Sequence, residues 1–399
     1  MNGKRWFLIF ITCSVFIVFL FAGATLYVDP YIHYKLPDQK FTYILNRANQ
    51  RYVNDGITRL FDYDAIITGT SMTECFKTTD FDRMFNVHSI KVPYAGAVYD
   101  EVTDNLNVAF NSGHNVKIIL RSLDFYALTK TYQNNYAKPE YMYDDNLLND
   151  HKYWFGRRAV AYSLLSLVRA ILGNPGGITS FDDYCNWSDS CIYGKNVLLK
   201  GRKAFERGKA REVELSPEDK EVLVNNIQTN LIDIAHKHPE TTFYYFLPPF
   251  SIVKWGEVYE AGEITKTIEE QKIAVKLLQS VSNIKVFAFD DCFDITTNLD
   301  NYREKEHYGG WINSFMLDAM HEGQHRLNSQ NTDAYFDNIT SFYARYNYAS
   351  LFDDYGDHAV LPRHNAHNVY GDHNKHCSHG GYRIASLNNN VLKAQIGTR

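Results

Sequence analysis

The sequence predicts an α/β protein, a three-layer α/β/α sandwich on a parallel, flavodoxin-like sheet, preceded by one transmembrane helix. Three observations support this class. Short apolar segments alternate with segments of helical pattern, which is typical of parallel strands covered by helices on both faces. A long uncharged run opens the chain. Finally, 399 residues, 45% of them hydrophobic, are enough for a sizeable core.

The uncharged run, residues 7–27, is interpreted as a membrane anchor. At about 1.5 Å per residue it spans a bilayer core of about 30 Å. A cleaved signal peptide is the alternative, because residues 22–24 resemble a cleavage region, but its apolar core is usually about 7–15 residues long. Lys4 and Arg5 precede the run and indicate that residues 1–6 are cytoplasmic. We therefore expect a single-pass protein of the cell membrane with an extracytoplasmic C-terminal domain.

Five short apolar segments are expected to form the sheet. Each is bounded by polar or turn-forming residues. They are residues 64–69, 88–94, 115–123, 241–251 and 284–291. The domain that they build is expected to cover residues 61–352, with residues 28–60 as a connector between the anchor and the domain.

Four segments have helical character. Residues 98–113 end at Gly113, a natural C-cap. Residues 216–240 begin with Ser216 as N-cap and Pro217 at the first helical position, followed by acidic residues. Residues 269–283 and 311–327 complete the set.

Residues 125–215 interrupt the alternation, and we interpret them as an insertion, which could form a helical lid over the end of the sheet. Tyrosines between 126 and 153 could line a sugar-binding cleft, although lid packing is the commoner explanation. Cys185 and Cys191 are candidates for a small disulfide loop in an extracytoplasmic compartment, with two free thiols as the alternative.

Residues 353–399 differ in character, and we expect a His-rich, disordered tail. A metal-binding tail is the alternative, but the histidine spacing matches no defined site. The histidines are His358, His364, His367, His373, His376 and His379. The net charge of −5 gives no basic surface for nucleic acid. The chain has no CxxC, P-loop or GxGxxG motif, and we expect no metal, nucleotide or other cofactor.

Ser71 is the candidate nucleophile. It follows the strand at 64–69 after a single residue, Thr70, and so lies at the carboxyl edge of the sheet, where ligands bind in such folds. Its backbone N–H would point out with the positive end of the following helix, toward an oxyanion. The alternative is that Ser71 only caps that helix, because serine is a favoured N-cap residue.

A nucleophilic serine needs a base, and the base needs an orienting acid. Glu304 and His307 are three residues apart, close enough to meet, and they follow the last predicted strand. Asp300 and Glu306 are rival orienting acids. The alternative is a solvated charged loop, since the sequence "REKEH" is simply polar.

Together, "ITGTSMTE", "PYAGAVYDE", "RSLDFYAL" and "YREKEHYGG" resemble the ordered blocks of the SGNH (GDSL-like) hydrolases. The resemblance covers about residues 60–330. The chain is similar in style to membrane-anchored members that act on cell-envelope polymers, including the alginate O-acetyltransferase proteins and the D-alanylation protein of teichoic acid synthesis. The resemblance implies Ser71 as nucleophile, the N–H groups of Ser71 and Gly96 as oxyanion hole, and Glu304 with His307 in place of the usual D-x-x-H.

The third block departs from the family pattern, because Asp124 stands where the family offers an asparagine side chain to the oxyanion. A carboxylate cannot donate a hydrogen bond unless it is protonated. Asp124 is therefore expected either to have another role, such as orienting Arg121, or to leave the oxyanion hole with two donors. Ser122 could donate instead.

The expected function is that of a membrane-anchored extracytoplasmic serine esterase or O-acyltransferase acting on cell-envelope or exported polysaccharide, with polysaccharide biosynthesis proteins as partners. The alternative is a catalytically inactive SGNH-like scaffold or binding subunit of a polysaccharide export or modification complex. A phosphodiesterase or nuclease is a third option. It would need clustered acidic metal ligands, for which residues 289–291 and Asp124 are the only hints.

Overall fold

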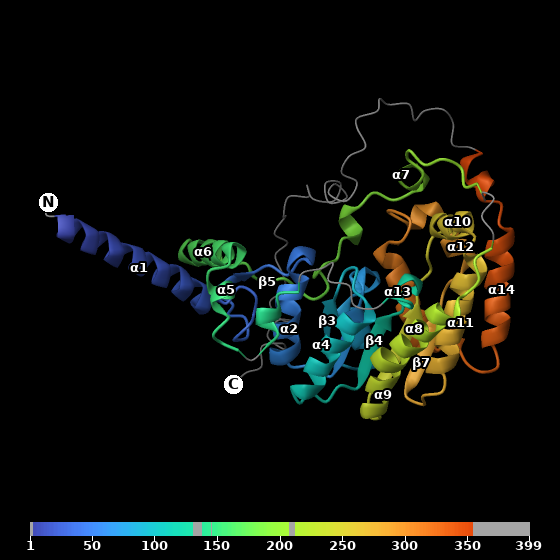
Figure 1. Ribbon diagram of the computed structural model, residues 1–399, viewed down its shortest axis with the longest axis horizontal. Coiled ribbons are helices and arrows are strands. Elements are labelled where there is room, and N and C mark those ends of the chain that lie inside the picture. The colour runs from blue at the N-terminus through green and yellow to red at the C-terminus, as the bar shows by residue number, and fades with distance from the viewer. Residues whose placement is uncertain (1–2, 131–137, 145, 207–211, 354–399) are drawn as a thin grey trace.

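The computed structural model describes residues 3–130, 138–144, 146–206 and 212–353 (Figure 1). The histidines of the expected tail lie outside the described residues. The described chain is a mixed α/β protein with a mostly parallel sheet and one apolar N-terminal helix.

The sheet confirms all five predicted strands. They are β2 (Ala65–Gly69), β3 (Ser89–Pro93), β4 (Ile118–Ser122), β6 (Thr242–Leu247) and β7 (Ile284–Ala288). The order across the sheet is β3-β2-β4-β6-β7-β8, in which only β8 (Arg326–Leu327) is antiparallel. The parallel strands thus have the flavodoxin-like order 2-1-3-4-5, whose ligand-binding switch point lies between β2 and β4.

The four predicted helices are also present, with shifted ends. The segment at 216–240 divides into α8 (Pro217–Ile227), a π-helical turn (Gln228–Ile232) and α9 (Asp233–Lys237). The others are α4 (Tyr99–Asn111), α11 (Ile264–Leu278) and α13 (Gly310–Glu322). The prediction for α13 ran too far, because Gly323 adopts φ +75° and ends the helix before β8. Helices that the sequence did not reveal include α3 (Thr78–Phe85), α10 (Ile252–Ala261), α12 (Phe293–Thr296) and α14 (Thr332–Arg345).

The N-terminal helix α1 (Gly3–Val28) has a mean hydropathy of 2.6 over its most apolar 18-residue window. By length and composition it could cross a membrane, as an anchor or as a signal sequence. Beyond it, the expected connector forms β1 (Thr42–Tyr43) and α2 (Gln50–Leu60). Helix α2 packs against α4 and β3 and buries Val53 and Ile57 fully, so it contributes to the core of the domain.

The insertion contains α5 (His151–Trp154), α6 (Arg157–Ile171), β5 (Gly177–Ile178) and α7 (Lys195–Leu198). Strand β5 pairs in parallel with β1 as a separate two-stranded sheet.

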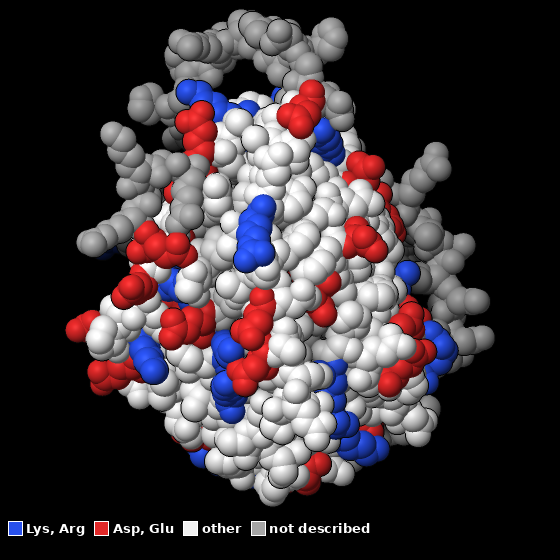
Figure 2. Space-filling model, turned by 90° about the vertical axis from the view of Figure 1, so that its right-hand side faces the viewer, with Lys and Arg blue, Asp and Glu red and all other residues white. Residues whose placement is uncertain are grey.

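On the face that Figure 2 shows, acidic and basic side chains are interspersed, and neither sign forms a patch.

The disulfide prediction is wrong, because Cys185 and Cys191 are both free thiols. The buried Cys185 Sγ accepts a hydrogen bond from Gln50 Nε2 at 3.2 Å. Cys191 Sγ instead accepts one from the Arg303 guanidinium at 3.3 Å. The two thiols therefore have different partners.

Candidate active site

The turn after β2 leaves the Ser71 hydroxyl available. Thr70, not Ser71, caps the 3₁₀ turn Ser71–Thr73, since its Oγ1 accepts a hydrogen bond from the Met72 N–H at 3.3 Å. Gly69 has φ +128°, and a Cβ there would lie 2.5 Å from Ser122 Oγ. Only glycine fits this close approach between β2 and β4.

Ser71, His307 and Glu304 lie in one line of contacts. Ser71 Oγ is 2.6 Å from His307 Nε2. On the other side of the ring, His307 Nδ1 contacts Glu304 Oε1, which also accepts the backbone N–H of His307 at 2.8 Å. A nucleophile, a base within hydrogen-bond reach and an acid that orients the base are the elements of a serine hydrolase triad.

The loop that carries Glu304 and His307 is a tight β-bridged turn. Tyr302 and Tyr308 pair across it, and the Arg303 N–H donates to the His307 carbonyl at 3.0 Å. Ser251, at the start of α10, fixes the tip by donating its hydroxyl to the Lys305 carbonyl at 2.6 Å. The loop lies between β7 and α13, so it emerges beyond the sheet, as expected from the sequence.

Glu304 is the acid that meets the imidazole. Burial raises the pKa of its carboxyl, but the charge and hydrogen bond of His307 outweigh that effect and hold the pKa at about 2. The rival Glu306 accepts a hydrogen bond from Lys254 Nζ at 2.7 Å. The other rival, Asp300, is exposed in the turn Leu299–Asn301.

Gly96 lies in the turn after β3, next to the turn that carries Ser71. Strands β2 and β3 end side by side, with Gly69 paired to Pro93, and Gly96 is exposed with φ +69°. Gln50 of α2 connects the two turns. Its Oε1 accepts the Ala95 N–H at 2.9 Å, and its Nε2 donates to Glu74 Oε1 at 2.7 Å.

Asp124 lies beneath the turn that carries Ser71, with a fully buried side chain. It accepts a hydrogen bond from the Thr70 hydroxyl, and Ser122 Oγ accepts the Thr70 backbone N–H at 3.2 Å. Burial raises the pKa of Asp124 to about 7, against the opposing effect of the Thr70 hydrogen bond. Both residues thus support the backbone that precedes Ser71.

The suggested link between Asp124 and Arg121 is wrong. Arg121 is adjacent to Ser122 on β4, and alternation along a strand turns neighbouring side chains to opposite faces. Its buried guanidinium donates to Thr103 Oγ1 at 3.0 Å and to the Tyr99 carbonyl at 2.9 Å.

Part of the insertion covers the site, so that Ser71 is only 5% exposed. The Trp187 ring meets His307 edge-on at 5.5 Å, and its Nε1 donates to Glu74 Oε2 at 2.8 Å. Beside it, Ser188 Oγ accepts the Gly310 N–H at 2.7 Å. Trp187 and Glu74 could not be assigned to the site from the sequence, because no local motif marks a tryptophan that reaches the site from an insertion.

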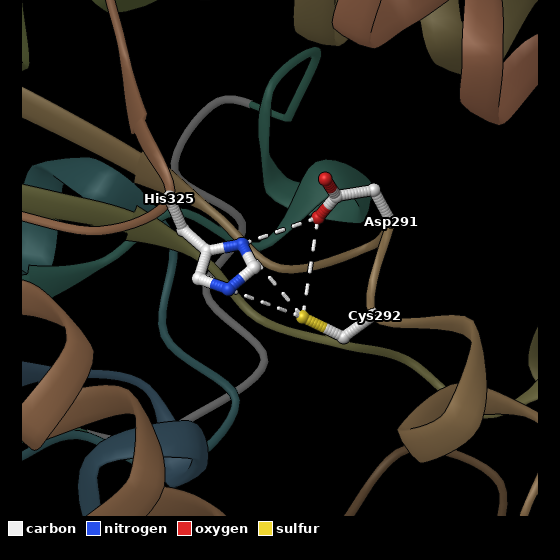
Figure 3. A group of neighbouring side chains, drawn as sticks. All are labelled: Asp291, Cys292 and His325. Carbon is white, nitrogen blue, oxygen red and sulfur yellow. Dashed lines mark hydrogen bonds and ion pairs between the residues drawn. The ribbon is translucent and has the colours of Figure 1, made fainter.

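A second group of ligand-type side chains lies at the β7–β8 edge, where Asp291 and Cys292 follow β7 and His325 precedes β8 (Figure 3). Cys292 Sγ is 3.9 Å from both ring nitrogens of His325, so it is aligned with neither lone pair. Burial, and then the Asp291 charge, raises the pKa of the Cys292 thiol to about 12. The thiol is therefore protonated at neutral pH, and a metal ion bound here would have to displace its proton. The sequence did not reveal this group because 33 residues separate Cys292 from His325.

No family model matches the chain, and no curated protein matches it. Among solved structures, the chain is similar to one from Streptococcus pneumonia that carries the provisional name platelet activating factor. The two are 10% identical over 69% of this chain and 91% of that one, with a TM-score of 0.35. A similarity at this level supports no conclusion about activity.

Proposed function

We propose that this chain is a membrane-anchored serine esterase or O-acyltransferase of the SGNH type, a three-layer α/β/α domain acting outside the cytoplasm on cell-envelope or exported polysaccharide. The observation that carries the proposal is the contact of Ser71 with His307 and of His307 with Glu304. The three residues meet beyond the carboxyl end of β2, next to the switch point of the sheet.

In the proposed reaction, Ser71 Oγ attacks the acyl carbonyl of an ester while His307 Nε2 takes the hydroxyl proton. His307 then gives that proton to the departing alkoxide, which leaves Ser71 acylated. Glu304 accepts the Nδ1–H and stabilises the imidazolium, a role that suits a carboxylate whose pKa is about 2. A water molecule or a sugar hydroxyl resolves the acyl-enzyme by the reverse sequence of steps.

The backbone N–H groups of Ser71 and Gly96 are proposed to bind the oxyanion. They follow paired strand ends, and Gln50 and Glu74 couple the two turns that carry them. Asp124 and Ser122 lie beneath the turn and act on the oxyanion hole only by holding Thr70.

The cover over Ser71 favours transfer to a hydroxyl acceptor over hydrolysis. Ser71 is only 5% exposed, with Trp187 in edge contact with His307, and an acyl-enzyme that is shielded from water survives until an acceptor arrives. Whether the acyl group goes to water or to a sugar hydroxyl then depends on which of these acceptors displaces Trp187 and Ser188.

Membrane anchoring by α1 is supported by how its last turn packs. Thr25 and Val28 are fully buried, and Asp29 follows at once. The Asp29 carboxylate accepts the Tyr34 N–H at 2.7 Å and the Tyr153 hydroxyl at 2.6 Å. Cleavage near residues 22–24 would cut a helix that is part of the domain, so an uncleaved anchor is the better explanation. Lys4 and Arg5 before the apolar run support a cytoplasmic N-terminus.

A non-catalytic scaffold is the second candidate, and the 5% exposure of Ser71 favours it. The deciding experiment uses the full chain in nanodiscs with p-nitrophenyl acetate, with and without an acetylatable oligosaccharide. We expect p-nitrophenol release that Ser71→Ala abolishes, together with acetyl transfer to the sugar. Ser314→Ala, at a half-buried position on α13, is the matched control. Equal release by the wild type and Ser71→Ala would support the scaffold.

A further inference from the structure

Helix α6 has an exposed apolar face, unlike a helix that only covers the core of a soluble protein. Its small side chains Ala159, Ser163 and Ser166 are buried, at 1% exposure or less. Tyr162 and Leu167 pack against the core, but other large apolar side chains of this segment face outward. They are Leu164 (37% exposed), Leu165 (42%), Val168 (52%) and Ile171 (83%), continued by Leu172 (74%) just beyond the helix.

The exposed apolar residues form one stripe. Positions 164, 165, 168, 171 and 172 follow the spacing i, i+1, i+4, i+7 and i+8, which places them on one face of an α-helix. A contiguous exposed apolar surface of this kind marks an interaction site.

The position of α6 indicates what covers this face. Helix α6 lies against α1, as does α5 (Figure 1). The buried residues of α1 are all near its C-terminal end, between Ala22 and Val28, so this end is where α5 and α6 pack. The rest of α1 exposes apolar side chains such as Phe16 (65%) and Phe19 (71%). The apolar stripe of α6 therefore adjoins the surface that a bilayer would cover.

Helix α6 is also fixed to the domain. Ser166 Oγ accepts the Thr42 N–H of β1 at 2.8 Å, and β1 in turn pairs with β5, which follows α6. The exposed Arg157 and Arg158 in the first turn of α6 supply positive charge that anionic lipid headgroups attract. At 15 residues, or about 22 Å, α6 is too short to span a bilayer.

We propose that the outward apolar face of α6 inserts into the lipid leaflet on the domain's side of the bilayer that α1 crosses. Helix α6 is then a monotopic second attachment, which holds the domain in one orientation around α1. This inference rests on the membrane placement of α1 under the proposed function, but on no part of the catalytic proposal.

Depth-dependent quenching tests the inference in the full chain, reconstituted in vesicles of phosphatidylcholine and phosphatidylglycerol. Single cysteines carry the fluorophore NBD in a background whose native cysteines are replaced by alanine. The probe positions are Ile171→Cys and, as a second site, Val168→Cys. Glu322→Cys, exposed at the far end of α13, is the water-facing control, and Phe16→Cys reports on α1.

We expect lipids with a doxyl group on the acyl chain to quench the probes at 171 and 168 at least threefold more than the probe at 322. Quenching at 16 with no more quenching at 171 and 168 than at 322 would overturn the α6 proposal while leaving α1 in the bilayer. A blue-shifted but unquenched probe at 171 would also overturn it, since a protein surface would then cover the helix. No quenching at 16 would refute the membrane placement itself.

Discussion

Replacing Asp124 by asparagine should stabilise the protein at alkaline pH and leave it nearly unchanged at acidic pH. The Asp124 side chain is fully buried, and its Oδ1 has no hydrogen-bond partner among the described residues. Burial raises its pKa from an ordinary 3.8 to about 7. The asparagine carbonyl can still accept the Thr70 hydroxyl, so the turn before Ser71 should persist.

The sign follows from proton linkage. Between pH 4 and 7 the folded state binds a proton that the unfolded state has lost, so the wild type loses stability as the pH rises through this range. A shift of about 3 units at 1.36 kcal/mol each gives a full loss of about 4 kcal/mol. Relaxation around the ionised carboxylate reduces this, and we expect about 2 kcal/mol at pH 8.5. The Asp124→Asn variant does not lose this stability at high pH, because an asparagine side chain does not ionise.

The assay is thermal unfolding of the full chain in detergent at pH 5 and pH 8.5, followed by intrinsic fluorescence. At roughly 2 °C per kcal/mol, Asp124→Asn should unfold about 4 °C above the wild type at pH 8.5 and within about 1 °C of it at pH 5. Asp318→Asn, at an exposed carboxyl on α13, should show no such difference. An Asp124→Asn variant that is equally or less stable than the wild type at pH 8.5 would refute the reasoning.

Three further predictions concern the turn before Ser71, the acid that orients His307 and the tryptophan beside the site. Gly69→Ala should lower the free energy of unfolding by about 2–4 kcal/mol in urea titration, because φ +128° and the Ser122 contact both oppose a Cβ; a neutral effect would contradict the turn geometry. Glu304→Gln should lower kcat about 10²- to 10⁴-fold with little change in KM in ester hydrolysis, because the amide can hold His307 in the wrong tautomer. An unchanged kcat would remove Glu304 from the triad. Trp187→Ala should speed the phosphonylation of Ser71 by a fluorophosphonate, by about tenfold for each 1.4 kcal/mol that moving Trp187 aside costs the wild type. The measurement is labelling stopped at a series of times. Slower phosphonylation would show that Trp187 does not block access.

The sheet could be predicted from the sequence because its signals are local. The apolar runs at 64–69 and 284–291 each end at turn residues, and the capped start at Ser216 and Pro217 is a short-range pattern. The helices α2 and α14 could not be predicted, because their apolar faces are recognisable only once their packing partners α4 and α11 are known. Strand β8 has only two residues and depends on pairing with β7.

The site was predictable where order along the chain implies neighbourhood in space. Ser71 and His307 both follow strands of one parallel sheet, so the topology places both at its carboxyl edge. Strands β2 and β7 are not neighbours, so the loop after β7 has to bring His307 back to Ser71. The roles of Thr70 as cap and Asp124 as its buried support depend on side-chain directions across β2 and β4. The approach of Trp187 depends on a long insertion whose path no local pattern sets.

The most direct test of the triad is to locate a fluorophosphonate adduct on the full chain in nanodiscs by peptide mass spectrometry. We predict a single adduct at Ser71 on the tryptic peptide 60–77, absent from Ser71→Ala and strongly reduced in His307→Gln. The Ser314→Ala control should label like the wild type. An adduct on another serine, or labelling of Ser71 that does not depend on His307, would contradict the account.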